Sequence, residues 1–337
     1  MPLCHTCTCV RCKCCEGALP EAISFSKGIK AGFKSFYQKI QLQIGWHLCD
    51  KTINTIPRTC WCFFTAANQL MNDEPLLRVK CFLLDMDGTF NLGDGIIDGS
   101  LYFIDTLNEL GIDYLFLTNN SSKHRGIYAE KITRLGLPTA EEKVFTAGEA
   151  TALYLAKEHP SASVYVVGTP ALEDEFRQHG FQLEENNPQL IVLGFDTTLT
   201  YQKLWKLCDF VRAGLPYIAT HPDFNCPTET GYMPDIGAII AFVRAATGRE
   251  PDLVVGKPNR MIVDAVAQKY GLPIEEMAMV GDRLYTDIAL GQTSGITTCL
   301  VLSGETTRED LAVSPFQPTY TFENLGAIAD WLKALHD

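Results

Sequence analysis

The chain has 337 residues, which is too long for one ordinary core and is typical of about two domains. Apolar residues make up 46% of it, so it can bury a large core, and its net charge of -12 argues against a nucleic-acid partner held through phosphates. No apolar run approaches the roughly 20 residues of a membrane-spanning helix, and the N-terminus has no continuous apolar stretch of the kind found in secretory signals.

The first 70 residues differ in composition from the rest of the chain. They hold eight Lys and Arg against three Asp and Glu, and nine of the 13 cysteines lie within the first 62 residues. The remaining cysteines are few and scattered, which is typical of proteins in the reducing cytoplasm, and this is the location we predict. Residues 1–70 are therefore expected to be a Cys-rich basic extension of the main body.

Three interpretations of this extension stay open. Its Cys-x-x-Cys spacings are compatible with a metal site, although six cysteines within 12 positions leave little chain to fold around one tetrahedral ion. Apolar residues among lysines over 20–45 resemble a basic amphipathic helix for a membrane surface, and a docked helix or a disordered tail fits equally well. The abrupt shift in composition also fits a natural start at Met71.

An apolar run from Cys81 to Leu84 is followed by Asp85 and Asp87. The run predicts a buried parallel strand, and because side chains alternate along a strand, both carboxylates should project together beyond its carboxyl end. Open α/β sheets bind ligands at this edge. Two carboxylates so close repel each other unless they share a proton or a cation, and Mg²⁺ is the usual cation. Alone, an Asp-x-Asp-Gly string also fits a calcium loop.

From residue 79 onward strand-like and helical runs alternate, which predicts βαβ units and a parallel sheet. Ser100 to Leu110 is predicted to be a helix that ends at Gly111. Its expected apolar face carries Leu101, Ile104, Leu107 and Leu110. A strand over 114–117 then leads into Thr118 and Asn119, whose hydroxyl and amide groups either cradle a phosphate oxygen or simply cap the next helix.

Residues 163–251 are predicted to form a second α/β unit. Its strands are expected near 164–167, 190–193 and 217–220, and the stretch from His221 to Asp235 is expected to be irregular.

The final third returns to the first pattern. Lys257 precedes a predicted helix, and because the helix dipole disfavours a cation there, an anion should lie nearby. A buried strand over 277–280 ends at Asp282, and Asp287 follows five residues later.

These separate pieces predict one site. Asp85 and Asp87 follow one strand, Thr118 and Asn119 a second, and Asp282 a third, and parallel strands end side by side at one edge of a sheet. The site would offer three acids for a cation, one lysine, and hydroxyl or amide donors. Transfer of a phosphoryl group requires such a set, because it needs a nucleophile, a metal and positive charge around the equatorial oxygens.

As a set, four segments resemble the motifs of the haloacid dehalogenase superfamily of phosphatases. They are Asp85-x-Asp87-Gly-Thr, Thr118-Asn119, Lys257 and Gly281-Asp282-x-x-x-x-Asp287. Further segments resemble its NagD-like, p-nitrophenylphosphatase branch, namely 118–123, 222–228, 234–239 and 256–258. The resemblance covers roughly residues 76–335. It departs at His221, where many relatives have Asn before Pro-Asp, and this puts the choice of substrate in doubt.

The resemblance implies an α/β fold. A Rossmann-like parallel-sheet core would be formed by residues 76–162 and 252–337, with an inserted α/β cap domain over 163–251. The cap would close over the substrate, and its loop from Gly231 to Asp235 would help to read the leaving group. Relatives in this branch often pair through the cap, which makes a homo-oligomer the corresponding expectation.

The implied activity is Mg²⁺-dependent hydrolysis of small phosphomonoesters, such as sugar phosphates or nucleoside monophosphates, through an aspartyl-phosphate. Asp85 would be the nucleophile and Asp87 the acid and base. The roles implied for the other residues are phosphoryl binding by Thr118, Asn119 and Lys257, Mg²⁺ binding by Asp85, Asp282 and the backbone carbonyl of Asp87, and support by Asp287. The alternatives are a phosphomutase or other phosphotransferase on this scaffold, and a non-catalytic binding protein.

Overall fold

The computed structural model describes residues 74–228 and 231–336, and Pro75–Asp337 forms one compact unit. The expectations for residues 1–70, namely the metal site, the amphipathic helix and the start at Met71, lie outside the described residues. Within the described ranges, no helix combines the length and the apolar character that crossing a bilayer requires.

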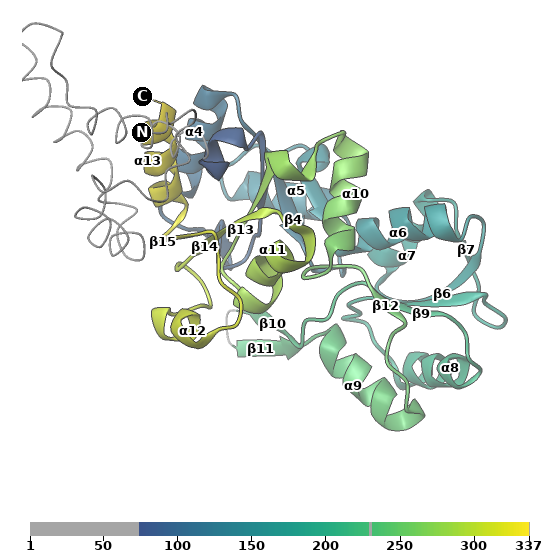
Figure 1. The fold of residues 1–337 in the computed structure, drawn as a ribbon. Helices are drawn as coiled ribbons and strands as arrows, with labels where there is room; N and C mark the ends of the chain where they lie inside the picture. The colour runs from purple at the N-terminus through teal and green to yellow at the C-terminus, as the bar shows by residue number, and fades with distance from the viewer. Residues whose placement is uncertain (1–73, 229–230, 337) are drawn as a thin grey trace, which may run out of the picture. The chain divides into compact units, whose positions relative to one another are not determined.

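This unit contains a six-stranded parallel sheet (Figure 1). Its strand order is β15-β14-β13-β1-β4-β5, which places β1 between β13 and β4. The strands are β1 (Cys81–Leu84), β4 (Asp113–Thr118), β5 (Val144–Thr146), β13 (Met277–Gly281), β14 (Thr297–Val301) and β15 (Tyr320–Phe322). The predicted parallel sheet is therefore confirmed, with the first strand at its centre.

Helices cover both faces of this sheet. Phe82 and Leu84 of β1 pack in one cluster with α4, α5 and α13, while Cys81 and Leu83 point to the opposite face and pack with α6, α10 and α11. These helices are α4 (Ser100–Leu110), α5 (Arg125–Arg134), α6 (Ala147–Glu158), α10 (Arg260–Tyr270), α11 (Ala289–Ser294) and α13 (Leu325–His336). Burial on both faces explains why β1 is apolar at every position.

The α4 helix has the predicted ends, but the predicted apolar face was partly wrong. It runs from Ser100 to Leu110, and Gly111 ends it in the left-handed conformation, with a φ of 68°. Its buried face centres on Phe103, Ile104 and Leu107, while Leu101 is exposed. The prediction counted Leu101 on the apolar face and left out Phe103, although Phe103 lies on the side of α4 that packs against the sheet.

A second, five-stranded parallel sheet has the order β12-β9-β8-β6-β7. Its strands are β6 (Ser163–Val167), β7 (Gln182–Leu183), β8 (Leu190–Leu193), β9 (Tyr217–Ala219) and β12 (Leu253–Val254). Helices α8 (Tyr201–Arg212) and α9 (Ile236–Thr247) pack on one face, and α7 (Pro170–Gln178) packs on the other. The predicted boundary at residue 251 was too early, because Leu253 and Val254 continue this sheet beside β9 before the chain reaches Lys257.

Two antiparallel hairpins complete the architecture. The hairpin of β2 (Asn91–Leu92) and β3 (Gly95–Ile96) follows the Asp87 turn. The other pairs β10 (Asn225–Thr228) with β11 (Gly231–Pro234), in the stretch that we predicted to be irregular. That prediction was wrong because we took Pro227 and Pro234 as signs that no strand forms, although proline is tolerated in edge strands, and both strands of a two-stranded ribbon are edges. The remaining helices are η2 (Pro75–Arg78), η3 (Glu141–Lys143), η4 (Ile274–Glu276), η5 (Leu284–Ile288) and α12 (Arg308–Val313).

Candidate active site

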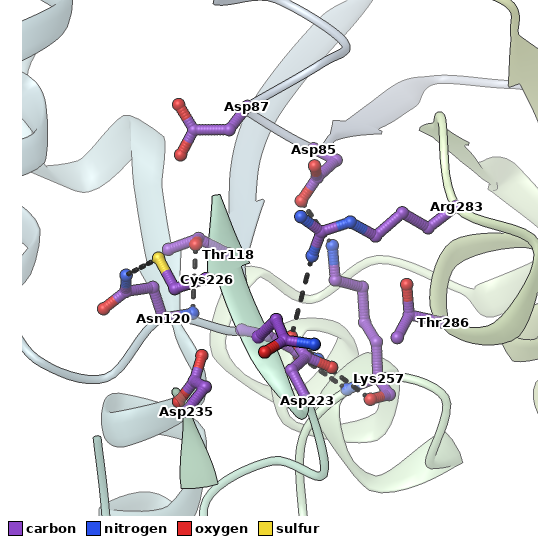
Figure 2. Close-up of a pocket in the computed structure, with 12 residues that line it drawn as sticks. Asp85, Asp87, Thr118, Asn120, Asp223, Cys226, Asp235, Lys257, Arg283 and Thr286 are labelled. Atoms are coloured by element: carbon purple, nitrogen blue, oxygen red, sulfur yellow. Dashed lines mark hydrogen bonds and ion pairs between the residues drawn. The ribbon is translucent and has the colours of Figure 1, made fainter. Parts of the chain in front are cut away.

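The carboxyl ends of β1, β4 and β13 meet at one edge of the six-stranded sheet, and a pocket opens there (Figure 2). Five of the residues that the sequence analysis singled out line this pocket, namely Asp85, Asp87, Thr118, Asn119 and Lys257. Asp282 and Asp287 are buried beside it, where each can act on the groups that line the pocket. The topology thus brings together residues that are up to 202 positions apart in the sequence.

Lys257 links two of the acids. Its Nζ lies 2.6 Å from Asp85 Oδ1 and 2.7 Å from Asp287 Oδ1, and its side chain is only 2% exposed. Burial acts to lower the pKa of Lys257, but the charges of Asp287 and Asp85 outweigh burial, so the pKa is raised. The lysine is therefore a fixed positive charge beside Asp85, and the anion expected near it is present.

Asn119 holds the backbone of Lys257 in place. The Lys257 N–H donates to Asn119 Oδ1 at 2.8 Å, and Asn119 Nδ2 donates to the Lys257 carbonyl at 2.9 Å. The same Nδ2 group lies 3.2 Å from Asp223 Oδ1. The Asn119 side chain is thus occupied by protein partners, while Thr118, whose Oγ1 accepts from the Asn120 N–H, can still donate its own hydrogen into the pocket.

Asp85, Asp282 and Asp287 form a cluster that could hold a cation. One oxygen of each carboxylate lies within 4.8 Å of the others. Burial and the negative charges of Asp85 and Asp287 raise the pKa of Asp282 to about 7. Burial also raises the pKa of Asp287 to about 6, although Lys257 opposes this. Negative charge is therefore in excess here, and a hard divalent cation with oxygen ligands would relieve it.

Two glycines fit closely around Asp282. A Cβ atom built on Gly304 would lie 2.0 Å from Asp282 Oδ2, and one built on Gly88 would lie 2.3 Å from it. The Glu305 N–H donates to the same oxygen at 2.7 Å. The backbone around Asp282 leaves no room for a side chain at Gly88 or Gly304 and thus holds the carboxylate in one orientation. A fixed orientation of this kind would suit a metal ligand.

Asp87 lines the pocket, but its carboxylate points away from Asp85 (Figure 2). Its Oδ1 accepts from Asn91 Nδ2 at 2.8 Å and from Lys131 Nζ at 3.2 Å. The prediction that the two carboxylates project together was wrong in this respect, because β1 ends at Leu84 and strand alternation does not continue into the turn.

Apart from the expectation that the loop from Gly231 to Asp235 helps to read the leaving group, the sequence reasoning gave no role to the residues that complete the pocket. The hairpin of β10 and β11 and its flanking residues bring Asp223, Asn225, Cys226 and Asp235 to it, and Arg283 approaches from the end of β13. Arg283 NH1 lies 3.9 Å from Asp223 Oδ2, and its Nε lies 3.0 Å from Glu305 Oε2. A lone arginine after Gly-Asp gives no signal in a sequence, whereas Asp223 and Asp235 lie in segments on which the branch resemblance rested.

Comparison with known proteins agrees with this geometry. The haloacid dehalogenase-like hydrolase family matches residues 82–182, and the HAD-hydrolase-like family matches residues 254–328. These ranges contain every residue that the sequence assigned to the site. The chain belongs to the haloacid dehalogenase-like hydrolases.

Individual relatives place it within one branch. A solved 4-nitrophenylphosphatase from Thermotoga maritima is 47% identical, has a TM-score of 0.74, and aligns over 76% of this chain and 98% of its own. A solved structure described as a NagD protein is 45% identical, with a TM-score of 0.71 and coverage of 77% and 99%. The acid sugar phosphatase of Staphylococcus aureus is 38% identical over 75% of this chain and 98% of its own. The chain lies in the NagD-like branch, as the motifs predicted.

Proposed function

We propose that this phosphoric monoester hydrolase uses Mg²⁺ to hydrolyse small phosphomonoesters through an aspartyl-phosphate on Asp85. The observation that supports this most directly is the ion pair of Asp85 with the buried Lys257 at 2.6 Å, because both residues line the pocket and Asp85 also belongs to the acidic cluster. Sugar phosphates and nucleoside monophosphates are the substrate types that we put forward.

In the first step Asp85 would attack phosphorus. A bond would form between a carboxylate oxygen of Asp85 and phosphorus, and the bond from phosphorus to the ester oxygen would break. Lys257 and the Thr118 hydroxyl would stabilise the charge on the phosphoryl oxygens. Because the side chain of Asn119 is engaged with Lys257 and Asp223, its main-chain N–H is the group that we assign to the phosphoryl oxygens.

Asp87 would transfer the protons. It would give a proton to the departing alkoxide, then take one from the water that attacks phosphorus, which releases inorganic phosphate and restores Asp85. In the present conformation Asn91 and Lys131 hold this carboxylate, so rotation of the side chain toward Asp85 would precede proton transfer.

The residues fit a magnesium ion. Asp85, Asp282 and the backbone carbonyl of Asp87 would hold it, and Asp287 would orient Lys257 and the waters around the ion. When bound, the ion supplies positive charge that screens the carboxylates from the phosphoryl group and stabilises charge in the transition state. The five-stranded sheet with α7, α8 and α9 would serve as the cap, and the cytoplasm is the location that we propose.

Phosphate release from a panel of phosphorylated metabolites tests the proposal. We expect turnover with Mg²⁺, loss of turnover with EDTA, and at least a thousandfold loss in Asp85→Asn, because a neutral amide is a poor nucleophile. Asp105→Asn, at an exposed position of α4, is the matched control and should retain wild-type turnover. Turnover that persists in Asp85→Asn, or transfer of the phosphoryl group to a second site of the substrate without phosphate release, would contradict the proposal.

A further inference from the structure

A second group of metal-binding side chains lies outside the pocket. Glu149 belongs to α6, Glu175 belongs to α7, and His179 is the C-cap residue of α7. One oxygen of each carboxylate and one ring nitrogen of His179 lie within 4.8 Å of one another. None of these three residues lines the pocket beside Asp85, so the group is separate from the proposed catalytic site.

The sequence brings these side chains together where α6 and α7 lie side by side (Figure 1). A Cβ atom built on Gly148 would lie 2.7 Å from a methyl carbon of Leu172, so the two helices are in close contact there. Glu149 is the next residue of α6, and Glu175 lies three positions after Leu172 on α7. His179 follows Glu175 by four positions, the spacing that places two side chains on one face of a helix.

Glu149 has a carboxylate oxygen without a partner. The residue is 3% exposed, and its Oε1 accepts from Lys269 Nζ and lies 3.6 Å from Arg125 NH1. Within the described part of the chain, no group forms a hydrogen bond with the buried Oε2. An unsatisfied carboxylate oxygen in a desolvated site is costly, and a donor or a cation is needed to satisfy it. Oε2 is therefore the oxygen that Glu149 can offer to a ligand.

Glu175 and His179 already have the separation of two ligands of one ion. His179 Nε2 lies 3.0 Å from Glu175 Oε1, and it is the only ion-pair partner of Glu175 among the described residues. Neighbouring ligands that each lie about 2.1 Å from a metal ion are about 3.0–3.4 Å apart. The His179 side chain is 23% exposed, so an ion could reach it from solvent.

We infer that Glu149, Glu175 and His179 form a second metal site, which takes a divalent transition-metal ion such as Mn²⁺ or Zn²⁺. An imidazole nitrogen beside two carboxylates suits these ions better than Mg²⁺ or Ca²⁺, which prefer oxygen ligands alone. The ion would satisfy Glu149 Oε2, and water would complete its coordination. Because α6 follows a strand of the six-stranded sheet and α7 packs on the five-stranded one, the ion would tie the two layers together.

Electron paramagnetic resonance of bound Mn²⁺ tests this site in the full-length chain. Mn²⁺ is the probe because the cysteines of residues 1–70 are soft ligands that suit it poorly. A large excess of Mg²⁺ competes with Mn²⁺ for the pocket, whose proposed ligands are all oxygens. We expect wild-type protein to bind one Mn²⁺ ion that Mg²⁺ does not displace. Zn²⁺ should displace it, since Zn²⁺ binds nitrogen and oxygen ligands more tightly than Mn²⁺ does.

Glu175→Gln and His179→Gln should each remove this ion. We expect at least about a hundredfold weaker binding of Mn²⁺, because even the loss of a residue that only supports a ligand can cost that much. His159→Gln is the matched control, since it makes the same change at the exposed C-cap residue of α6 and should leave the affinity for Mn²⁺ unchanged. Circular dichroism of each variant checks that it is folded.

The ion should also stabilise the fold. With Mn²⁺ at about a hundred times its Kd and Mg²⁺ in excess, we expect the melting temperature of wild type to rise by about 5 °C or more over Mg²⁺ alone, and that of His179→Gln to stay constant. Wild-type protein that binds no Mn²⁺ in excess Mg²⁺ would overturn the inference. Folded Glu175→Gln and His179→Gln that bind Mn²⁺ as tightly as His159→Gln would also overturn it. Neither readout uses phosphate release, so either failure leaves the proposed function intact.

Discussion

At the scale of single residues, Lys257 supplies the positive charge that offsets the repulsion between the carboxylates of Asp85 and Asp287. We expect Lys257→Met to abolish turnover and to lower the free energy of unfolding by about 3–5 kcal/mol, because Asp85 and Asp287 lose the charge that pairs with them. Arg260→Met, at the first residue of α10, is the control. Its ion pair with Asp264 is exposed and should contribute less than about 1 kcal/mol to the free energy of unfolding. Urea unfolding of both variants measures the difference, and equal losses would contradict the argument.

The charge of Lys257 itself should not change near neutral pH. Its pKa in the folded chain is raised above the ordinary value of 10.5, so the stabilisation is fully present below 10.5 and is lost only as the pH rises through the higher folded value. Any pH dependence of the difference in unfolding free energy between wild type and Lys257→Met around pH 6 to 7 should therefore come from Asp287 and Asp282, whose pKa values are about 6 and about 7, and not from loss of the charge of Lys257 itself.

Cys226 lies in the pocket but should be a slow nucleophile. Burial, together with the charges of Asp235 and Asp87, raises the pKa of its thiol to about 11. Because the raised pKa leaves about a hundredfold less thiolate at neutral pH than an ordinary thiol has, iodoacetamide should label this position slowly, and the rate should rise about tenfold per pH unit up to pH 10. Mass spectrometry of the peptide containing Cys226 gives the rate, and labelling as fast as in the urea-unfolded chain would be the contrary result.

At the scale of elements, the loop after β14 holds Asp282 in place through Gly304. We expect Gly304→Ala to displace this carboxylate and weaken Mg²⁺ binding by about 10-fold or more, because the new Cβ has no room beside Oδ2. Gly111→Ala is the matched control, since nothing lies within 4 Å of its Cβ and its positive φ costs about 1–2 kcal/mol of stability without touching the site. Calorimetric titration with Mg²⁺ separates the two, and equal affinities would show that Asp282 does not bind the ion.

Elements with one strong pattern could be predicted from the sequence, and elements without one could not. The strands β1, β4, β8 and β13 lie within a residue or two of their expected positions, because buried runs of apolar residues are unmistakable at this length. The β10–β11 hairpin was missed, because prolines and polar residues hide its alternation. The direction of the Asp87 side chain was missed for a related reason, since side chains in a turn do not alternate between two faces as they do along a strand. His221 stood out only as a departure from relatives, and its hydrogen bond with Asp235, 14 positions further along the chain, follows no sequence pattern.

At the scale of the whole molecule, one apolar cluster joins the two sheets. Residues of β1 and β4 belong to the same cluster as Val164 and Val166 of β6 and Leu190 and Val192 of β8, with α6 and α7 between them. The alternation of elements predicted a second α/β unit, but it did not predict the continuity of this cluster, because a sequence pattern shows which face of an element is apolar and not which element packs against it. The compact unit Pro75–Asp337 therefore contains a complete core and every residue of the site.

Because the compact unit contains the core and the site, we expect a chain that starts at Met71 to retain the fold and the phosphatase activity. The relatives align over nearly their whole length with about three quarters of this chain, and their extent matches the compact unit. We expect kcat/KM within about twofold of the full-length chain and a similar melting temperature, since domains with their own core fold independently. Phosphate release and calorimetry on both chains provide the measurement. An aggregated product, or a loss of activity above about tenfold in a folded one, would show that residues 1–70 take part in folding or catalysis.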